Sequence, residues 1–126
     1  MKQWQGDFER RGKERVYTGG GHALVVLPQE RLLCEMVDVS MEGIGVYYLG
    51  RGSLLGGGMQ RGILVGVDDL WLAGIPLRTV SDTVVRVPLM SGRPCVRRRG
   101  MHFGSLSGTQ RQVLEQYILL NGRGSA

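Results

Sequence analysis

The chain has 126 residues, of which 42% are apolar, and a formal net charge of +5. This length suits one domain with one modest core. No apolar run approaches the roughly 20 residues that a membrane helix needs, and the opening MKQWQGDF lacks the apolar core of a signal peptide. Two cysteines are too few for a disulfide framework. We therefore expect a soluble cytoplasmic protein with reduced thiols, whose basic charge favours an anionic partner.

The first residues carry a cluster of positive charge. The stretch FERRGKERV holds Arg10, Arg11 and Arg15 around a glycine and a lysine. We expect residues 1–16 to form a flexible leader, because this segment is polar and precedes any obvious strand. By itself, such a leader is either a solvated charged segment or a grip on an anionic molecule.

Short segments rich in β-branched residues follow, separated by glycine clusters that are typical of turns. Short strands at this spacing predict an antiparallel barrel or sandwich. Parallel βαβ units are not expected, because no helical pattern separates the strands. The expected strands are residues 23–27, 32–39, 45–49, 62–67, 75–81, 83–87 and 95–103.

One expected strand ends in polar residues. In VDVSMEGIG, Asp38 and Ser40 are two residues apart, so on a strand their side chains point to the same face. Gly43 then permits a turn or a close approach of another backbone. Two interpretations stay open: turn-forming residues at a strand end, or polar groups placed on a wall to bind a ligand.

The last expected strand contains three consecutive arginines, Arg97, Arg98 and Arg99. Alternation places Arg97 and Arg99 on one face and Arg98 on the other, so all three cannot line one site. They are either solvated strand residues or a partial source of phosphate contacts.

A helix is expected near the end of the chain. Ser107 and Gln110 form a capping box, and Asn121–Gly122 supplies a stop. The domain then covers residues 17–122, with residues 123–126 as a frayed tail. The apolar positions that follow the cap at helical spacing are Val113, Leu114, Tyr117 and Ile118.

Two motifs occur in order along the chain. Arg11 and Arg15 form R-x-x-x-R, and Asp38, Ser40 and Gly43 form D-x-S-x-x-G. This pairing resembles the PilZ-domain family, receptors for the bacterial second messenger cyclic di-GMP. Members have a six-stranded antiparallel β-barrel and a late strand that ends in a G-x-x-F-like element before a C-terminal α-helix, which RGMHFGSLS matches. The resemblance covers nearly the whole chain and implies a mainly β, stand-alone PilZ-type barrel.

The resemblance also implies the ligand and its contacts. Arg11 and Arg15 would grip guanines and phosphates of cyclic di-GMP, because an arginine can pair with a guanine edge, bind phosphate or stack on a purine. Asp38 and Ser40 would hold guanine edges, and Gly43 would let the backbone come close. Ligand binding would order the leader and signal to an unidentified effector protein in motility, adhesion or exopolysaccharide control. The implied role is a receptor rather than an enzyme, with no cofactor and no metal.

Arg10 precedes the first motif directly. In the PilZ family this position is linked to ligand stoichiometry, and an arginine there resembles members that bind a stacked dimer of cyclic di-GMP. Two other functions remain as alternatives. The charge also permits a nucleic-acid-binding barrel, although an aromatic content of 6% is low for stacking many bases. A PilZ-like adaptor that signals without a ligand is the third interpretation.

Overall fold

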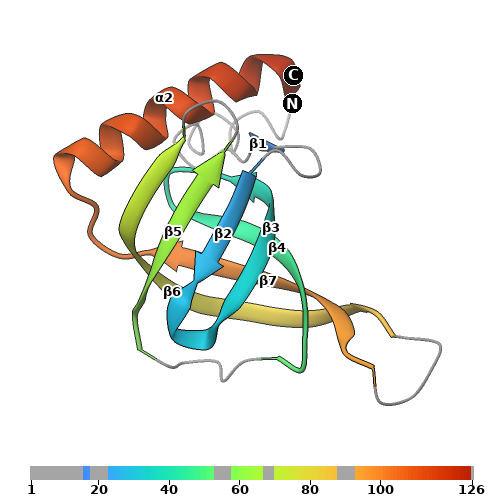
Figure 1. Ribbon diagram of the computed structural model, residues 1–126. Helices are drawn as coiled ribbons and strands as arrows, with labels where there is room; N and C mark the ends of the chain where they lie inside the picture. The colour runs from blue at the N-terminus through green and yellow to red at the C-terminus, as the bar shows by residue number, and fades with distance from the viewer. Residues whose placement is uncertain (1–15, 18–22, 53–57, 67–69, 88–92, 126) are drawn as a thin grey trace, which may run out of the picture.

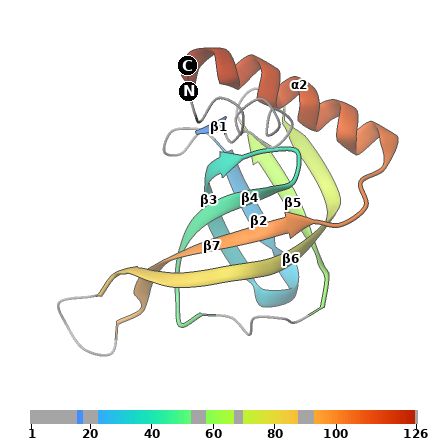
Figure 2. The same ribbon diagram turned by 180° about the vertical axis from the view of Figure 1, so that it is seen from behind.

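The computed structural model describes residues 16–17, 23–52, 58–66, 70–87 and 93–125. Strands form a barrel, and one long helix lies across one end of it (Figures 1 and 2). The elements are β1 (Val16–Tyr17), β2 (Ala23–Leu27), the short 3-10 helix η2 (Pro28–Glu30), β3 (Leu32–Val39), β4 (Gly43–Gly50), β5 (Gln60–Gly66), β6 (Trp71–Arg86), β7 (Cys95–Phe103) and α2 (Gly108–Ser125).

The barrel closes through six strands that pair in the order β2, β3, β4, β7, β6, β5 and back to β2. Closure occurs at β3, which pairs with β2 along one edge and with β4 along the other. Every pairing among the described strands is antiparallel, and the two-residue β1 adds to the end of β3. The predicted six-stranded antiparallel barrel with a C-terminal helix is confirmed.

The predicted strands 23–27, 32–39 and 95–103 match β2, β3 and β7, whereas the third quarter of the chain differs. The segments predicted as 75–81 and 83–87 form one continuous strand, β6. Its ladder with β7 contains two register shifts, and its ladder with β5 contains a third near Gly74, whose φ is +66°. Each bulge adds a residue and interrupts the two-residue alternation. The sequence pattern therefore resembles two short strands.

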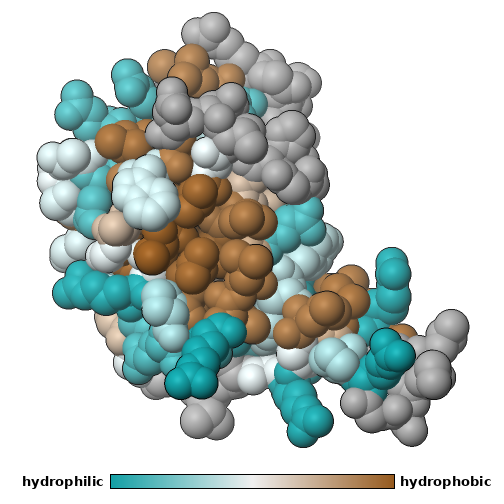
Figure 3. Space-filling view, viewed as in Figure 1, coloured by the Kyte–Doolittle hydropathy of each residue, from teal (hydrophilic) through white to brown (hydrophobic). Residues whose placement is uncertain are grey.

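Inward-facing side chains fill the barrel with a close-packed apolar core. Val25, Met36, Val46, Leu64 and Leu77 come from five different strands, and each is 0% exposed. On the wall around β2, β3 and β5, the outward-facing side chains are also largely apolar (Figure 3). This wall lies opposite the wall formed by β4 and β7 (Figures 1 and 2).

The helix α2 begins as predicted and ends later than predicted. The amide of Ser107 donates to Oε1 of Gln110 at 2.9 Å, and the amide of Gln110 donates to Oγ of Ser107 at 3.0 Å, which completes the capping box. Leu114 and Tyr117 join the core of the barrel. The predicted stop at Asn121–Gly122 and the frayed tail from residue 123 are wrong, because the helix continues to Ser125. A glycine inside a helix costs only about 1 kcal/mol relative to alanine, so an Asn–Gly pair need not end one.

No helix in the described part of the chain is both long and apolar enough to span a membrane.

Candidate ligand-binding site

The second motif lies where β3 turns into β4. The amide of Ser40 donates to the carbonyl oxygen of Gly43 at 2.9 Å, and the amide of Glu42 donates to Oγ of Ser40 at 3.1 Å. Ser40 is 1% exposed. Its hydroxyl therefore fixes the turn, as the first of the two sequence interpretations expected. The first motif, with Arg10, Arg11 and Arg15, lies outside the described residues.

Gly43 permits a close approach between two strands. A Cβ at this position would lie 2.1 Å from the carbonyl oxygen of Met101 on β7, which is far inside van der Waals contact. The close backbone approach expected from the sequence therefore occurs between β4 and β7. It keeps the outer face of the turn free of a side chain.

Asp38 faces the outside of the barrel because of a β-bulge. Regular alternation would place it on the inner face with Cys34 and Met36. The register with β4 shifts between Met36 and Asp38, so Asp38 lies opposite Gly45 instead. Because the neighbours of Gly45 on β4 belong to the core, Gly45 and Asp38 both face outward. The bulge thus moves a carboxylate from the core to the outer wall.

Three glycines make this outer wall flat. In cross-strand register, Asp38 is followed by Gly45 on β4, then Gly100 on β7, then Ser81 on β6. Gly43 lies two residues before Gly45 on the same face. We call Gly43, Gly45 and Gly100 the glycine floor. The floor is part of the wall formed by β4, β7 and β6, which faces the viewer in Figure 2.

Arg98 borders the glycine floor and binds Asp38. Its Nη2 donates to Oδ2 of Asp38 at 2.7 Å, and its guanidinium lies 5.8 Å from the ring centroid of Tyr47. The hydrogen bond to Asp38 raises the pKa of Arg98. The two side chains differ in access to solvent, because that of Arg98 is 38% exposed and that of Asp38 only 2%. The site therefore offers a nearly buried acceptor beside a reachable donor.

On the other side of the floor, the turn contributes to an open cavity of about 490 Å³. Its charged and titratable lining residues are Glu42, Arg78, His102 and Arg111. His102 lies opposite Gly43 on β4 and Arg78 on β6. Polar groups therefore border the glycine floor at both ends.

Comparison with solved structures identifies the fold. The chain superposes on the PilZ domain of YcgR from Escherichia coli, described with c-di-GMP, with a TM-score of 0.65 and 14% identity over 88% of this chain and 90% of that one. The chain adopts the PilZ fold. It also superposes on MrkH, described as a c-di-GMP-dependent transcription regulatory factor, with a TM-score of 0.64 and 13% identity. This match covers 83% of the chain but 48% of MrkH. No protein-family model and no curated protein sequence matches the chain.

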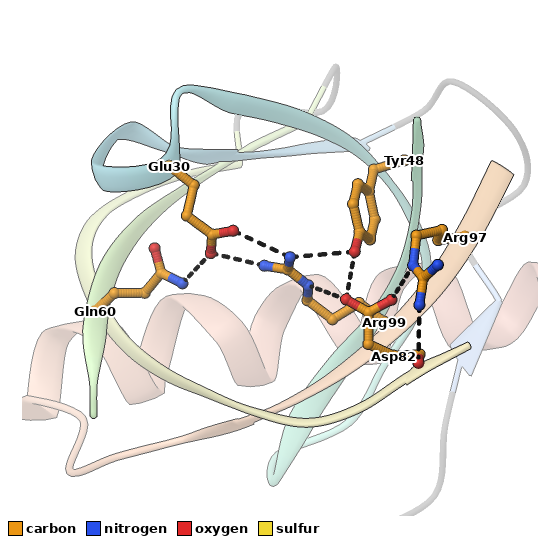
Figure 4. Close-up of polar contacts among 6 residues, drawn as sticks. All are labelled: Glu30, Tyr48, Gln60, Asp82, Arg97 and Arg99. Carbon is orange, nitrogen blue, oxygen red and sulfur yellow. Dashed lines mark hydrogen bonds and ion pairs between the residues drawn. The ribbon is translucent and has the colours of Figure 1, made fainter. Parts of the chain in front are cut away.

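Inside the PilZ barrel, the neighbours of Arg98 form a charged network (Figure 4). Arg99 is 0% exposed and donates to Glu30 at 2.8 and 3.1 Å, to Asp82 at 3.2 Å and to the hydroxyl of Tyr48 at 3.2 Å. Arg97 donates to the same Asp82 at 2.6 Å. Arg97 and Arg99 thus share one face of β7 and Arg98 takes the other, as alternation predicted.

The network keeps its members ionised. Burial opposes the charge of Arg99, but its hydrogen bonds to Glu30 and Tyr48 raise the pKa of Arg99 overall. The hydrogen bond from Arg99 lowers the pKa of Glu30. Burial alone would raise the pKa of Asp82, yet hydrogen bonds from Tyr48 and Arg97 lower it below its usual value. These opposite charges anchor β7 from inside the PilZ barrel.

The sequence analysis missed two parts of the candidate site. Gly45 and Gly100 were not identified as a shared surface, although Gly43 and Gly45 are two residues apart and so face one side of a strand. The pairing of Arg98 with Asp38 was also missed, because the two residues are 60 positions apart. Only the pairing of β3, β4 and β7 brings them together.

Proposed function

We propose that this chain is a cyclic di-GMP receptor of the PilZ family that passes the signal to another protein. The observation that carries the proposal is the outward-facing Asp38 carboxylate beside the glycine floor. A carboxylate accepts the N–H groups of a guanine edge, and a surface without side chains lets a flat purine approach the backbone. Both solved PilZ-fold neighbours are described with c-di-GMP or as dependent on it, which supports the same ligand class.

In this proposal, each motif has its own task. Asp38 accepts hydrogen bonds from guanine, and Ser40 and Gly43 hold the β3–β4 turn in the shape that presents it. Arg11 and Arg15 in the leader supply the planar, charged donors that guanine and phosphate need.

Signalling follows from the division of the site between the leader and the barrel. Ligand binding draws the leader arginines over the outer wall, and this creates a new surface for an effector protein. The chain acts as a cytoplasmic receptor, with a nucleotide as its ligand and no catalytic step. Arg10 favours a stacked dimer of cyclic di-GMP, so Arg10→Leu should lower the stoichiometry from two ligands per chain toward one.

The test compares cyclic di-GMP with a short RNA by calorimetric titration of the full chain at two salt concentrations. We expect binding of cyclic di-GMP with a weak dependence on salt, because the ligand has only two phosphates. Polynucleotide binding releases many counterions and would weaken steeply as salt rises. Tight RNA binding without any heat from cyclic di-GMP would favour the nucleic-acid-binding alternative.

A further inference from the structure

Asp38 and Arg98 form a planar pair at the border of the glycine floor. Nη2 of Arg98 lies 2.7 Å from Oδ2 of Asp38. An alanine Cβ at Gly45 would lie 2.8 Å from Oδ1 of Asp38 and 2.9 Å from Nη2 of Arg98. Both polar ends therefore lie over the position where Gly45 has no side chain.

This pair presents hydrogen-bonding groups in a fixed order. Arg98 uses one of its five N–H donors on Asp38, so the guanidinium retains others. Each carboxylate oxygen of Asp38 has two lone pairs and accepts further bonds. Taken across the pair, the order is donor, acceptor, acceptor. The Watson–Crick edge of guanine has the complementary order: the O6 acceptor, the N1–H donor and the N2–H donor.

We propose that Arg98 is a specificity residue, and that the Asp38–Arg98 pair reads the Watson–Crick edge of one guanine. This inference rests on the proposed function, which assigns the ligand but gives Arg98 no part in binding it. Asp38 accepts from N1–H and N2–H, while Arg98 donates to O6. The pair thus takes the place that cytosine has opposite guanine in a duplex.

The surroundings of the pair favour Arg98 over the other two arginines of β7. Arg97 and Arg99 are held inside the barrel by Asp82. Arg98 points outward, is 38% exposed and lies beside the ring of Tyr47. It is therefore the member of the arginine run that a base over the floor can reach.

Adenine would not fit the same pair. Its N6 amino group would meet the donors of Arg98, and its N1 acceptor would meet the carboxylate of Asp38. Leaving nearly buried polar groups unpaired is costly, and sites of this kind reject mismatched ligands strongly. The pair therefore predicts a preference for cyclic di-GMP over cyclic di-AMP.

The experiment measures affinities of the full chain for cyclic di-GMP and cyclic di-AMP, in the wild type and in Arg98→Gln. Loss of one good base contact should weaken cyclic di-GMP binding about tenfold to a hundredfold. Binding of cyclic di-AMP should not weaken, so the preference for guanine should fall by the same factor. Arg61→Gln is the matched control: Arg61 is exposed on β5 in the opposite wall, and both affinities should stay at wild-type values.

Arg98→Lys keeps the charge and provides a second test if Arg98→Gln folds poorly. Lysine has no planar fork to bind Asp38 and O6 together, so we expect an intermediate loss of guanine preference. If the wild type binds cyclic di-GMP and either folded variant keeps the same preference, the inference is wrong and the proposed function stands. A loss of the same size for both dinucleotides also overturns it, because that marks a general electrostatic role. If the wild type binds neither dinucleotide, the proposed function itself fails.

Discussion

Replacement of Arg99 by methionine should destabilise the barrel strongly. The guanidinium of Arg99 is 0% exposed and donates to Glu30, Asp82 and Tyr48. Removing one partner of a buried ion pair typically costs about 3–5 kcal/mol. Here the lower end applies, because Glu30 is 31% exposed and can rehydrate, while Asp82 keeps Arg97 at 2.6 Å. We therefore expect a loss of about 3 kcal/mol in the free energy of unfolding.

Urea-induced unfolding provides the assay. For a domain of this size we take a urea slope of about 1.5 kcal/mol per molar, so 3 kcal/mol corresponds to a midpoint about 2 M lower. Arg97→Met is the matched control, because Arg97 also binds Asp82 but lies nearer to solvent, and its midpoint should fall less. Adding Asp82→Asn to Arg99→Met should recover part of the loss, since it removes a carboxylate left short of a partner. An Arg99→Met midpoint equal to that of the wild type would refute the reasoning.

Three further predictions follow from single contacts. Gly43→Ala should lower the free energy of unfolding by about 1–3 kcal/mol, because its Cβ would lie 2.1 Å from a backbone oxygen of β7; an unchanged urea midpoint would contradict this close approach. Cys34 should resist iodoacetamide at pH 8 in the folded protein, because burial raises the pKa of its thiol to about 12, whereas the half-buried Cys95 should react; mass spectrometry would show the opposite if Cys34 were accessible. Glu30 and Asp82 have lowered pKa values, so their stabilisation is complete above the ordinary values of 4.5 and 3.8 and is lost as pH falls through the lower folded-state values. Asp82→Asn should flatten the fall in thermal midpoint between about pH 4 and pH 2, and a profile as steep as that of the wild type would argue against this carboxylate.

Local signals in the sequence predicted much of the fold. β3 follows from its alternation and from the turn residues behind it. The start of α2 follows from a capping box that involves only Ser107 and Gln110. Both features depend on neighbours within a few positions, so the sequence alone specifies them. The end of α2 was harder to predict, because an Asn–Gly pair lowers helix stability without forbidding a helix.

The candidate site was predictable only in part. The D-x-S-x-x-G residues were identified, but regular alternation gives Asp38 the wrong face unless the bulge after Met36 is known. Bulges depend on the register of a partner strand, and β4 sets that register here. Likewise, the pairing of Asp38 with Arg98 depends on which strands become neighbours when the barrel closes. Long-range pairing, rather than local propensity, therefore builds the donor–acceptor pair.

The central claim is that Asp38 on the outer wall contacts a guanine of cyclic di-GMP. Calorimetric titration of the full chain with cyclic di-GMP tests it most directly when the wild type is compared with Asp38→Ala and Glu35→Ala. Glu35 lies on the same strand opposite Tyr47, so its removal controls for the loss of one acidic side chain from β3. The account predicts wild-type affinity for Glu35→Ala and at least a tenfold loss for Asp38→Ala, in line with the loss of a base contact. Equal affinity in all three folded proteins would contradict it.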